Sequence, residues 1–103
     1  MITLDDALDY MGIDYADDVI RANVARAMGS AEKILLGAVG RDLETYLPDD
    51  PRSDELRLIY TDDLYSERGV SAKVSGATRK LVANMVLQLR LELADAKEAA
   101  GNV

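Results

Sequence analysis

Apolar side chains recur along most of the chain at the three- and four-residue spacing of amphipathic α-helices. No segment alternates apolar and polar residues for long enough to predict a strand. Thr3 and Asp6 have the spacing of a capping box before a first short helix, and Gly12 provides a stop after it. We therefore expect an all-α fold, a small bundle of about four helices at residues 3–11, 16–39, 51–67 and 76–99.

The clearest helical pattern lies in residues 16–39. Asp17 and Asp18 stand where acidic side chains favour the positive end of a helix dipole, and Gly40 marks the end of the pattern. At about 100° per residue, the apolar residues of this segment fall in one arc. We expect that arc to face the core: Ile20, Val24, Ala27, Met28, Ala31, Ile34, Leu35 and Ala38.

Two prolines prevent a continuous helix through residues 41–53, which we expect to form a connector. Asp50 followed by Pro51 is typical of an N-cap and the first residue of a helix. In this third helix one face is expected to be buried: Leu56, Ile59, Tyr60 and Leu64. Leu58 and Tyr65 project to the other side, where another subunit could cover them.

The last helix, expected over residues 76–99, has more apolar surface than one contact can bury. One arc should face the core: Leu81, Val82, Met85, Val86, Leu89 and Leu93. Leu87 and Leu91, flanked by Ala83 and Ala94, form a second stripe on the other side. At about 1.5 Å per residue such a helix spans about 36 Å, more than a compact core of this size needs. We expect a copy of the chain or a partner to cover the second stripe, with the short first helix as the alternative cover.

The composition limits the possible chemistry. A chain of 103 residues predicts a single helical domain, residues 1–103. The absence of Cys and His excludes disulfides, thiolate nucleophiles and histidine bases, and we expect no cofactor, no metal and no enzymatic activity. No apolar run approaches the roughly 20 residues that cross a bilayer, and residues 1–6 lack the basic start of a signal peptide. We therefore expect a protein used inside a cell or packed into a particle assembled there.

The charge is strongly acidic, with a net value of −7 and a pI near 4.4. Such a chain is poorly suited to binding DNA or an anionic membrane, because both carry negative charge. Residues 1–20 carry six acids and no base, whereas residues 68–103 carry six bases and three acids. This asymmetry is typical either of ordinary solvated helix faces or of a subunit whose acidic and basic sides pack head to tail in a ring. The acids that we expect to face a channel or a partner are Asp5, Asp6, Asp9, Asp49 and Asp50.

One pair of carboxylates keeps a remote enzymatic alternative open. Glu92 and Asp95 are three residues apart on one helix face, as in half of the metal site of all-α nucleotide pyrophosphohydrolases. The Glu-x-x-Glu partner of that site occurs nowhere in the chain, and neither does a phosphate-binding glycine loop. A carboxylate–metal nucleotide hydrolase is therefore the weakest functional hypothesis for this sequence, behind the two non-catalytic hypotheses described below.

The order of the motifs resembles a known family. Residues 4–14 (LDDALDYMGID) resemble the opening of the head–tail connector proteins of tailed bacteriophages, which act as head-completion or DNA-packaging adaptors. Residues 17–20 (DDVI) lead into an Ala-rich helix similar to the second helix of that family. Leu64-Tyr65-x-x-Arg68 is similar to the signature that closes its third helix. The resemblance covers the chain to about residue 70; it departs at Leu8, where Lys is common, and in the long last helix.

The resemblance implies a structural, non-catalytic role. Connector proteins form a homo-oligomeric ring between the portal and the tail or stopper proteins, at the neck of the virion, after assembly in the host cytoplasm. DNA passes through the ring without being bound specifically, and no membrane is involved. The candidate interface residues are Leu58, Tyr65, Arg68, Ala83, Leu87 and Leu91. The alternative is a small acidic helical adaptor or regulator that binds one partner protein through Leu87 and Leu91.

Overall fold

A computed structural model of the chain describes residues 1–66 and 76–101, with side chains described outside 76–78. Helices account for 81% of the described residues and none of these residues lies in a strand, which confirms the all-α fold. The five helices are α1 (Leu4–Tyr10), α2 (Asp18–Val39), α3 (Leu43–Tyr46), α4 (Pro51–Ser66) and α5 (Gly76–Gly101).

The starts of α1 and α2 follow from local side-chain hydrogen bonds. The N–H of Asp6 donates to Thr3 Oγ1 (3.1 Å) and the N–H of Thr3 donates to the Asp6 carboxylate (2.8 Å), which confirms the capping box. The hydrogen bonds that the backbone N–H and the hydroxyl of Thr3 make with the Asp6 carboxylate lower the pKa of Asp6. Asp17 caps α2 by accepting a hydrogen bond from the N–H of Ile20 (2.8 Å), so this helix begins at Asp18 rather than at residue 16.

The expected connector at residues 41–53 contains a helix that the pattern does not predict. The single turn α3 buries Leu43 completely in the core. Four residues are too few to show a helical period, so the sequence indicated only a connector here. The described part of the chain therefore contains the four predicted helices and the additional single turn α3.

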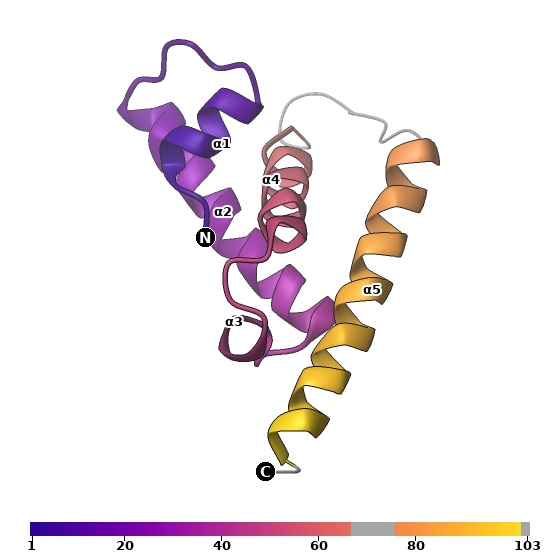
Figure 1. Cartoon of the computed structure of the whole chain (residues 1–103). Helices are drawn as coiled ribbons and strands as arrows, with labels where there is room; N and C mark the ends of the chain where they lie inside the picture. Colours follow the sequence, from indigo (N-terminus) through magenta and orange to yellow (C-terminus); the bar gives the residue numbers. More distant parts are fainter. Residues whose placement is uncertain (67–75, 102–103) are drawn as a thin grey trace.

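The helices form an elongated bundle with α2 and α4 at its centre (Figure 1). These two helices make the most extensive contact, while α1 packs on one side of them and α5 on the other. The radius of gyration is 15.0 Å, against about 13 Å for a compact chain of this length. The long α5, which runs along one edge of the bundle, accounts for much of this extension.

Two hydrophobic clusters lie at the two sides of the central helices. The main cluster is formed by α2, α3, α4 and α5: Leu35, Val39, Leu43, Leu56, Ile59, Met85, Leu89 and Leu93. The N-terminal cluster is formed by α1 and α2 around Ala7, Leu8 and Val24, with Leu58 and Tyr65 of α4 packed against it. Because both clusters share α2 and α4, these helices connect the two halves of the bundle.

Two residues expected in the core are exposed instead. Ile34 on α2 is 43% exposed and Leu81 on α5 is 53% exposed. Each lies at the edge of the apolar arc of its helix. The neighbouring helices cover only the central part of that arc, which is narrower than the arc that the sequence pattern predicts. The centres of both arcs are buried as predicted.

None of the described helices combines the length and the apolar content that a membrane-spanning segment requires.

Candidate functional site

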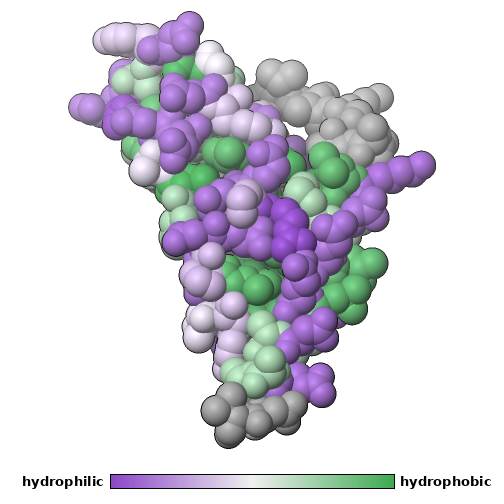
Figure 2. All heavy atoms as spheres, viewed as in Figure 1, coloured by the Kyte–Doolittle hydropathy of each residue, from purple (hydrophilic) through white to green (hydrophobic). Residues whose placement is uncertain are grey.

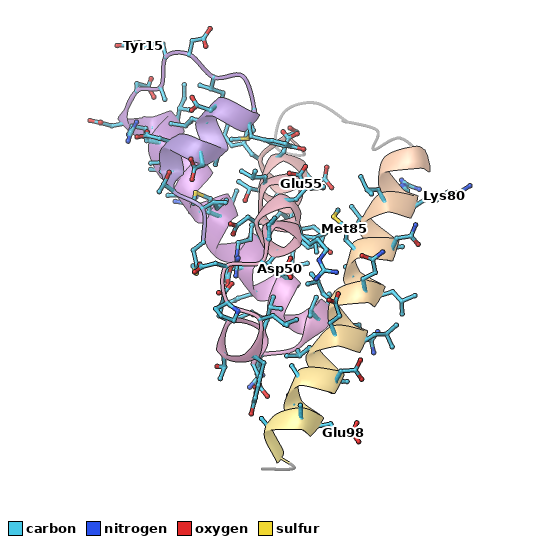
Figure 3. All side chains as sticks on the ribbon, in the orientation of Figure 1. Tyr15, Asp50, Glu55, Lys80, Met85 and Glu98 are labelled. Carbon is cyan, nitrogen blue, oxygen red and sulfur yellow. The ribbon has the colours of Figure 1, made fainter. Side chains whose placement is uncertain are left out.

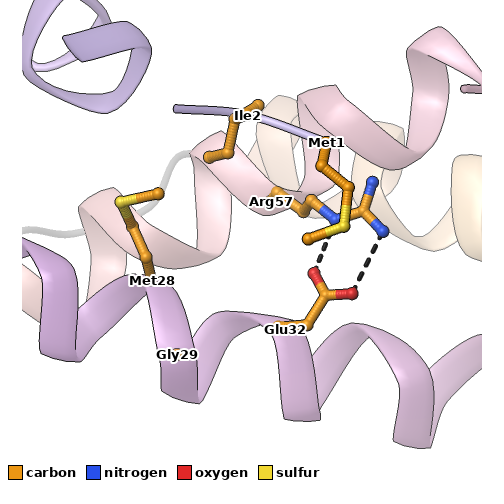
Figure 4. Close-up of a pocket in the computed structure, with 6 residues that line it drawn as sticks. All are labelled: Met1, Ile2, Met28, Gly29, Glu32 and Arg57. Atoms are coloured by element: carbon orange, nitrogen blue, oxygen red, sulfur yellow. Dashed lines mark hydrogen bonds and ion pairs between the residues drawn. The ribbon is translucent and has the colours of Figure 1, made fainter. Parts of the chain in front are cut away.

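A buried arginine lies at the junction of three helices. The side chain of Arg57 on α4 is only 3% exposed. Its Nε and Nη2 donate to the two oxygens of Glu32 on α2, at 2.6 and 3.1 Å (Figure 4). Its Nη2 also donates to Glu44 on α3 (2.7 Å), and its Nη1 to Asp54 (2.9 Å). Burial by itself would lower the pKa of Arg57, but the hydrogen bonds to these carboxylates raise it, so the side chain stays charged.

The surroundings of Arg57 favour a structural role over a ligand site. Its three kinds of nitrogen already donate to carboxylates of the chain. The adjacent pocket, lined largely by Met1, Ile2, Met28 and Gly29, measures about 270 Å³, below the roughly 300–1,000 Å³ of typical ligand cavities. We therefore interpret Arg57 as the residue that fixes how α2, α3 and α4 meet.

The sequence analysis missed this cluster, although one signal was present. Ser53, Arg57 and Thr61 are spaced by four residues, and all three are buried on α4. The hydroxyl of Thr61 donates to the backbone carbonyl of Arg57 (2.6 Å). A polar stripe at helical spacing inside an otherwise half-apolar helix indicates such a junction, but it does not identify the partners on other helices.

The outer face of α5 carries an uncovered apolar stripe. We call its six exposed residues the outer stripe: Lys80, Ala83, Leu87, Leu91, Ala94 and Glu98. Leu87 is 55% exposed and Leu91 is 59% exposed, although Leu89 between them is fully buried. Apolar atoms protrude along the free edge of α5 in Figure 2. No described residue covers the two leucines, so α1 is not their cover.

Charged residues distinguish the two ends of α5. Arg79 and Lys80 are exposed at its N-terminal end. Near its C-terminal end Lys97 Nζ lies 2.8 Å from Asp42, which raises the pKa of this lysine. Glu98 is exposed beside it. The basic start and the acidic end of the outer stripe are thus available to another molecule.

An acidic surface lies at the opposite side of the bundle. Asp5 and Asp9 of α1, Asp14 of the following loop and Arg21 line a shallow pocket of about 350 Å³. Outside this pocket, Tyr15 in the loop before α2 is 85% exposed and Val19 in the first turn of α2 is 68% exposed. We call this surface the acidic face: Asp5, Asp9, Asp14, Tyr15 and Val19. Figure 3 shows Tyr15 at the far end of this region, pointing away from the bundle.

The predicted channel acids differ in what they contact. Asp5 and Asp9 belong to the acidic face, while Asp6 is engaged in the capping box of α1. The side chain of Asp49 is 89% exposed. Asp50 is held by Arg52, whose Nη2 lies 2.7 Å from its carboxylate, and these hydrogen bonds lower its pKa. Asp50 therefore contributes to the start of α4 rather than presenting a solvated charge.

The predicted interface residues fall into two groups. Ala83, Leu87 and Leu91 lie together on the outer stripe. Leu58 and Tyr65 are half-buried against the N-terminal cluster, so the chain itself covers part of their surface, which the sequence analysis did not foresee. Arg68 lies outside the described residues.

The carboxylate pair that suggested a metal site is not joined by further ligands. Glu92 forms an ion pair with Arg52, and Asp95 is exposed. In residues 1–66 and 76–101, no three acidic side chains are grouped so that they could hold a metal ion.

Comparison of this chain with protein-family models, with curated proteins and with solved structures finds no match. The resemblance to the connector family therefore rests on the motif residues themselves.

Proposed function

We propose that this protein is a structural subunit that assembles head to tail with copies of itself, as the head–tail connector of a tailed bacteriophage or prophage. Its ring would join the portal to the tail or stopper proteins and leave an opening for DNA. The observation that carries this proposal is the outer stripe of α5, on which Leu87 and Leu91 stay more than half exposed. Large apolar side chains grouped on one surface are typical of protein–protein contacts.

Two unlike surfaces support a head-to-tail contact. The acidic face combines carboxylates with Tyr15 and Val19, on the α1 side of the bundle. The outer stripe combines two leucines with Lys80, and exposed Arg90 lies beside it on α5. Because complementary surfaces lie on opposite sides, each copy can contact one neighbour through each surface. Such heterologous contacts close a ring when the rotation between neighbours permits it.

The positions of the motifs also support this proposal. The connector-like segment 4–14 forms α1 and the turn after it, and Leu64 and Tyr65 lie in the last turns of α4. The net charge of −7 fits a ring that DNA passes through, since an acidic wall does not hold phosphates. A connector of this kind would act without catalysis, at the virion neck.

The experiment combines electron microscopy with native mass spectrometry on the purified protein, alone and with a purified phage portal protein. We expect closed rings at high protein concentration, or at lower concentration once portal is added. Leu87→Glu and Val19→Glu alter the two surfaces separately, and each variant alone should lose the ring. An equimolar mixture of the two variants should stop at one-to-one pairs, since a single heterologous contact survives.

Ala25→Glu is the matched control, because it places the same charge at an exposed position of α2 that belongs to neither surface. This variant should still form rings. Monomers at every concentration, with and without portal, would contradict the proposal, as would rings that tolerate both surface variants.

The adaptor alternative uses the outer stripe for one partner of different sequence. It differs in its response to Val19→Glu, which should leave partner binding unchanged while Leu87→Glu abolishes it. The uncovered stripe supports both functions, but only the connector also uses the acidic face.

A further inference from the structure

The leucines and the charged residues of the outer stripe of α5 are symmetric about Leu89. Lys80 lies nine residues before this point and Glu98 lies nine residues after it. These two residues are five full helical turns apart, so they project from the same side of α5. Figure 3 shows both side chains at opposite ends of α5, pointing away from the bundle.

The two leucines of the stripe have the same symmetry, and the two alanines depart from it by one residue. Leu87 and Leu91 lie two residues before and after Leu89, while Ala83 and Ala94 lie six before and five after it. The stripe thus has two leucines at its centre, an alanine beyond each, and opposite charges at its ends.

We propose that the outer stripe binds the outer stripe of a second copy of this chain, with the two α5 helices antiparallel. Reversing one helix about Leu89 brings Lys80 opposite the second copy's Glu98 at both ends of the pair. At about 1.5 Å per residue, each charge lies about 13.5 Å from the midpoint, so the two ion pairs are in register. A parallel pair would instead bring lysine to lysine and glutamate to glutamate.

The antiparallel register also matches the side-chain sizes. Leu87 meets the second copy's Leu91, and Ala83 lies within one residue, about 1.5 Å along the axis, of the second copy's Ala94. Because alanine is small, the helices can approach to the roughly 8–10 Å of ordinary helix packing. The leucines, now more than half exposed, are then removed from water.

The described core contacts of α5 lie on the side of the helix away from the paired stripe. Met85 and Leu89, which face the main cluster, project about 160° away from Leu87 around α5. Each bundle therefore lies on the outer side of its own helix. The contact is isologous, so it is complete with two copies and leaves no free stripe for a third.

This inference does not rest on the proposed ring, but it bears on it. Pair and ring use the same stripe, so a paired subunit cannot enter a ring until the pair dissociates. The pair is thus the form in which free subunits bury Leu87 and Leu91 before a ring assembles.

The test is sedimentation equilibrium on the wild type and on charge variants of the full chain. Without portal, the wild type should pair at concentrations below those at which rings form, and Leu87→Glu should lose the pair while Ala25→Glu keeps it. Lys80→Glu and Glu98→Lys should each weaken pairing about tenfold, since each places like charges at both ends. The double variant K80E/E98K should regain wild-type pairing.

Glu98→Lys is the decisive variant. It weakens the antiparallel pair, although it makes the stripe more basic and would strengthen docking onto the acidic face. Tighter association of Glu98→Lys would overturn the inference. Wild-type protein that stays monomeric at all concentrations would also overturn it, as would weak pairing of the double variant K80E/E98K.

Failure of this inference is distinguishable from failure of the proposed function. Val19→Glu should abolish the ring and leave the pair unchanged. Pairs without rings would contradict only the proposed function, and rings formed from subunits that never pair would contradict only the inference.

Discussion

Arg57 determines how α2, α3 and α4 meet, although it is a charged residue and not part of either hydrophobic cluster. A buried charge is costly unless other groups compensate it, and here carboxylates from α2, α3 and α4 surround the guanidinium. Replacing such a cluster by apolar residues is often tolerated, whereas removing one partner is strongly destabilising. The planar, five-donor guanidinium also fixes directions that a lysine would not fix.

Arg57→Met should therefore lower the free energy of unfolding by about 3 kcal/mol, because Glu32, Glu44 and Asp54 are left facing one another. Urea denaturation followed by circular dichroism measures this change. The control Arg26→Met removes an exposed arginine of α2 and should change stability by less than about 0.5 kcal/mol. Equal stability of the two variants would show that the cluster contributes nothing.

The lowered pKa of Asp50 predicts that the stability of the folded protein depends on pH. Its hydrogen bonds to Arg52 lower the pKa of its carboxyl below the ordinary value of about 3.9. The carboxylate therefore stabilises the folded state above about pH 4, and this contribution is lost as the pH falls through the lowered pKa. Asp50→Asn should be less stable than the wild type at neutral pH, and the difference should shrink below about pH 4.

Urea titrations at a series of pH values measure this difference. Asp49→Asn, which removes the exposed neighbouring carboxylate, is the control and should show a much smaller difference across the series. A constant difference between Asp50→Asn and the wild type at all pH values would contradict the assignment.

At the scale of single helices, a glycine in the last turn of α2 and the glycine that caps this helix have opposite roles. Gly40 ends the helix with a φ of 149°, which L side chains rarely adopt, and a Cβ there would lie 2.6 Å from Leu93 Cδ2. Gly37 lies in the helix with open space where a Cβ would be. Gly40 is therefore required by the backbone, while Gly37 only weakens the helix.

Gly40→Ala should lower the free energy of unfolding by about 1–2 kcal/mol through backbone strain. Gly37→Ala should raise it by about 0.5–1 kcal/mol, because alanine loses less backbone freedom on folding. Thermal unfolding of both variants measures the two changes against the same wild type. Shifts of the same sign would be inconsistent with this account of the end of α2.

The helices differ in how far the sequence predicted their faces. α2 and α5 each bury one arc against neighbours, so their periodicity predicted most of their core residues. α4 contributes Leu56 to the main cluster and Leu58 to the N-terminal cluster, and its buried stripe between them is polar. A helix in contact on several sides shows no single apolar face, and this is why Leu58 was expected at an interface.

At the scale of the whole molecule, the two clusters are unequal. The main cluster joins parts of four helices, whereas the N-terminal cluster depends on the seven residues of α1 packed against α2 and α4. Short elements with few buried contacts open locally at lower free energy than the rest of a protein. We therefore expect α1 to detach without unfolding of the main cluster.

Leu8→Ala and Leu89→Ala distinguish the clusters. Leu89→Ala should lower the global free energy of unfolding by about 3 kcal/mol or more, since it leaves a cavity in the main cluster. Leu8→Ala should mainly reduce the protection of α1 amides in hydrogen exchange, with α4 and α5 little changed. Equal loss of protection in all helices of the Leu8→Ala variant would show that the clusters unfold together.

The sequence by itself determined the helical class, the capping box at Thr3 and the two-sided character of α5. These features depend on residues within a few turns of one another, so local spacing specifies them. Only the tertiary structure decided which carboxylates surround Arg57, since Glu32 is 25 positions away from it and Glu44 is 13. It alone also decided that Leu58 and Tyr65 are partly covered while Leu87 and Leu91 are not. Such contacts arise when distant helices pack, and the packing of each helix depends on the positions of all the others.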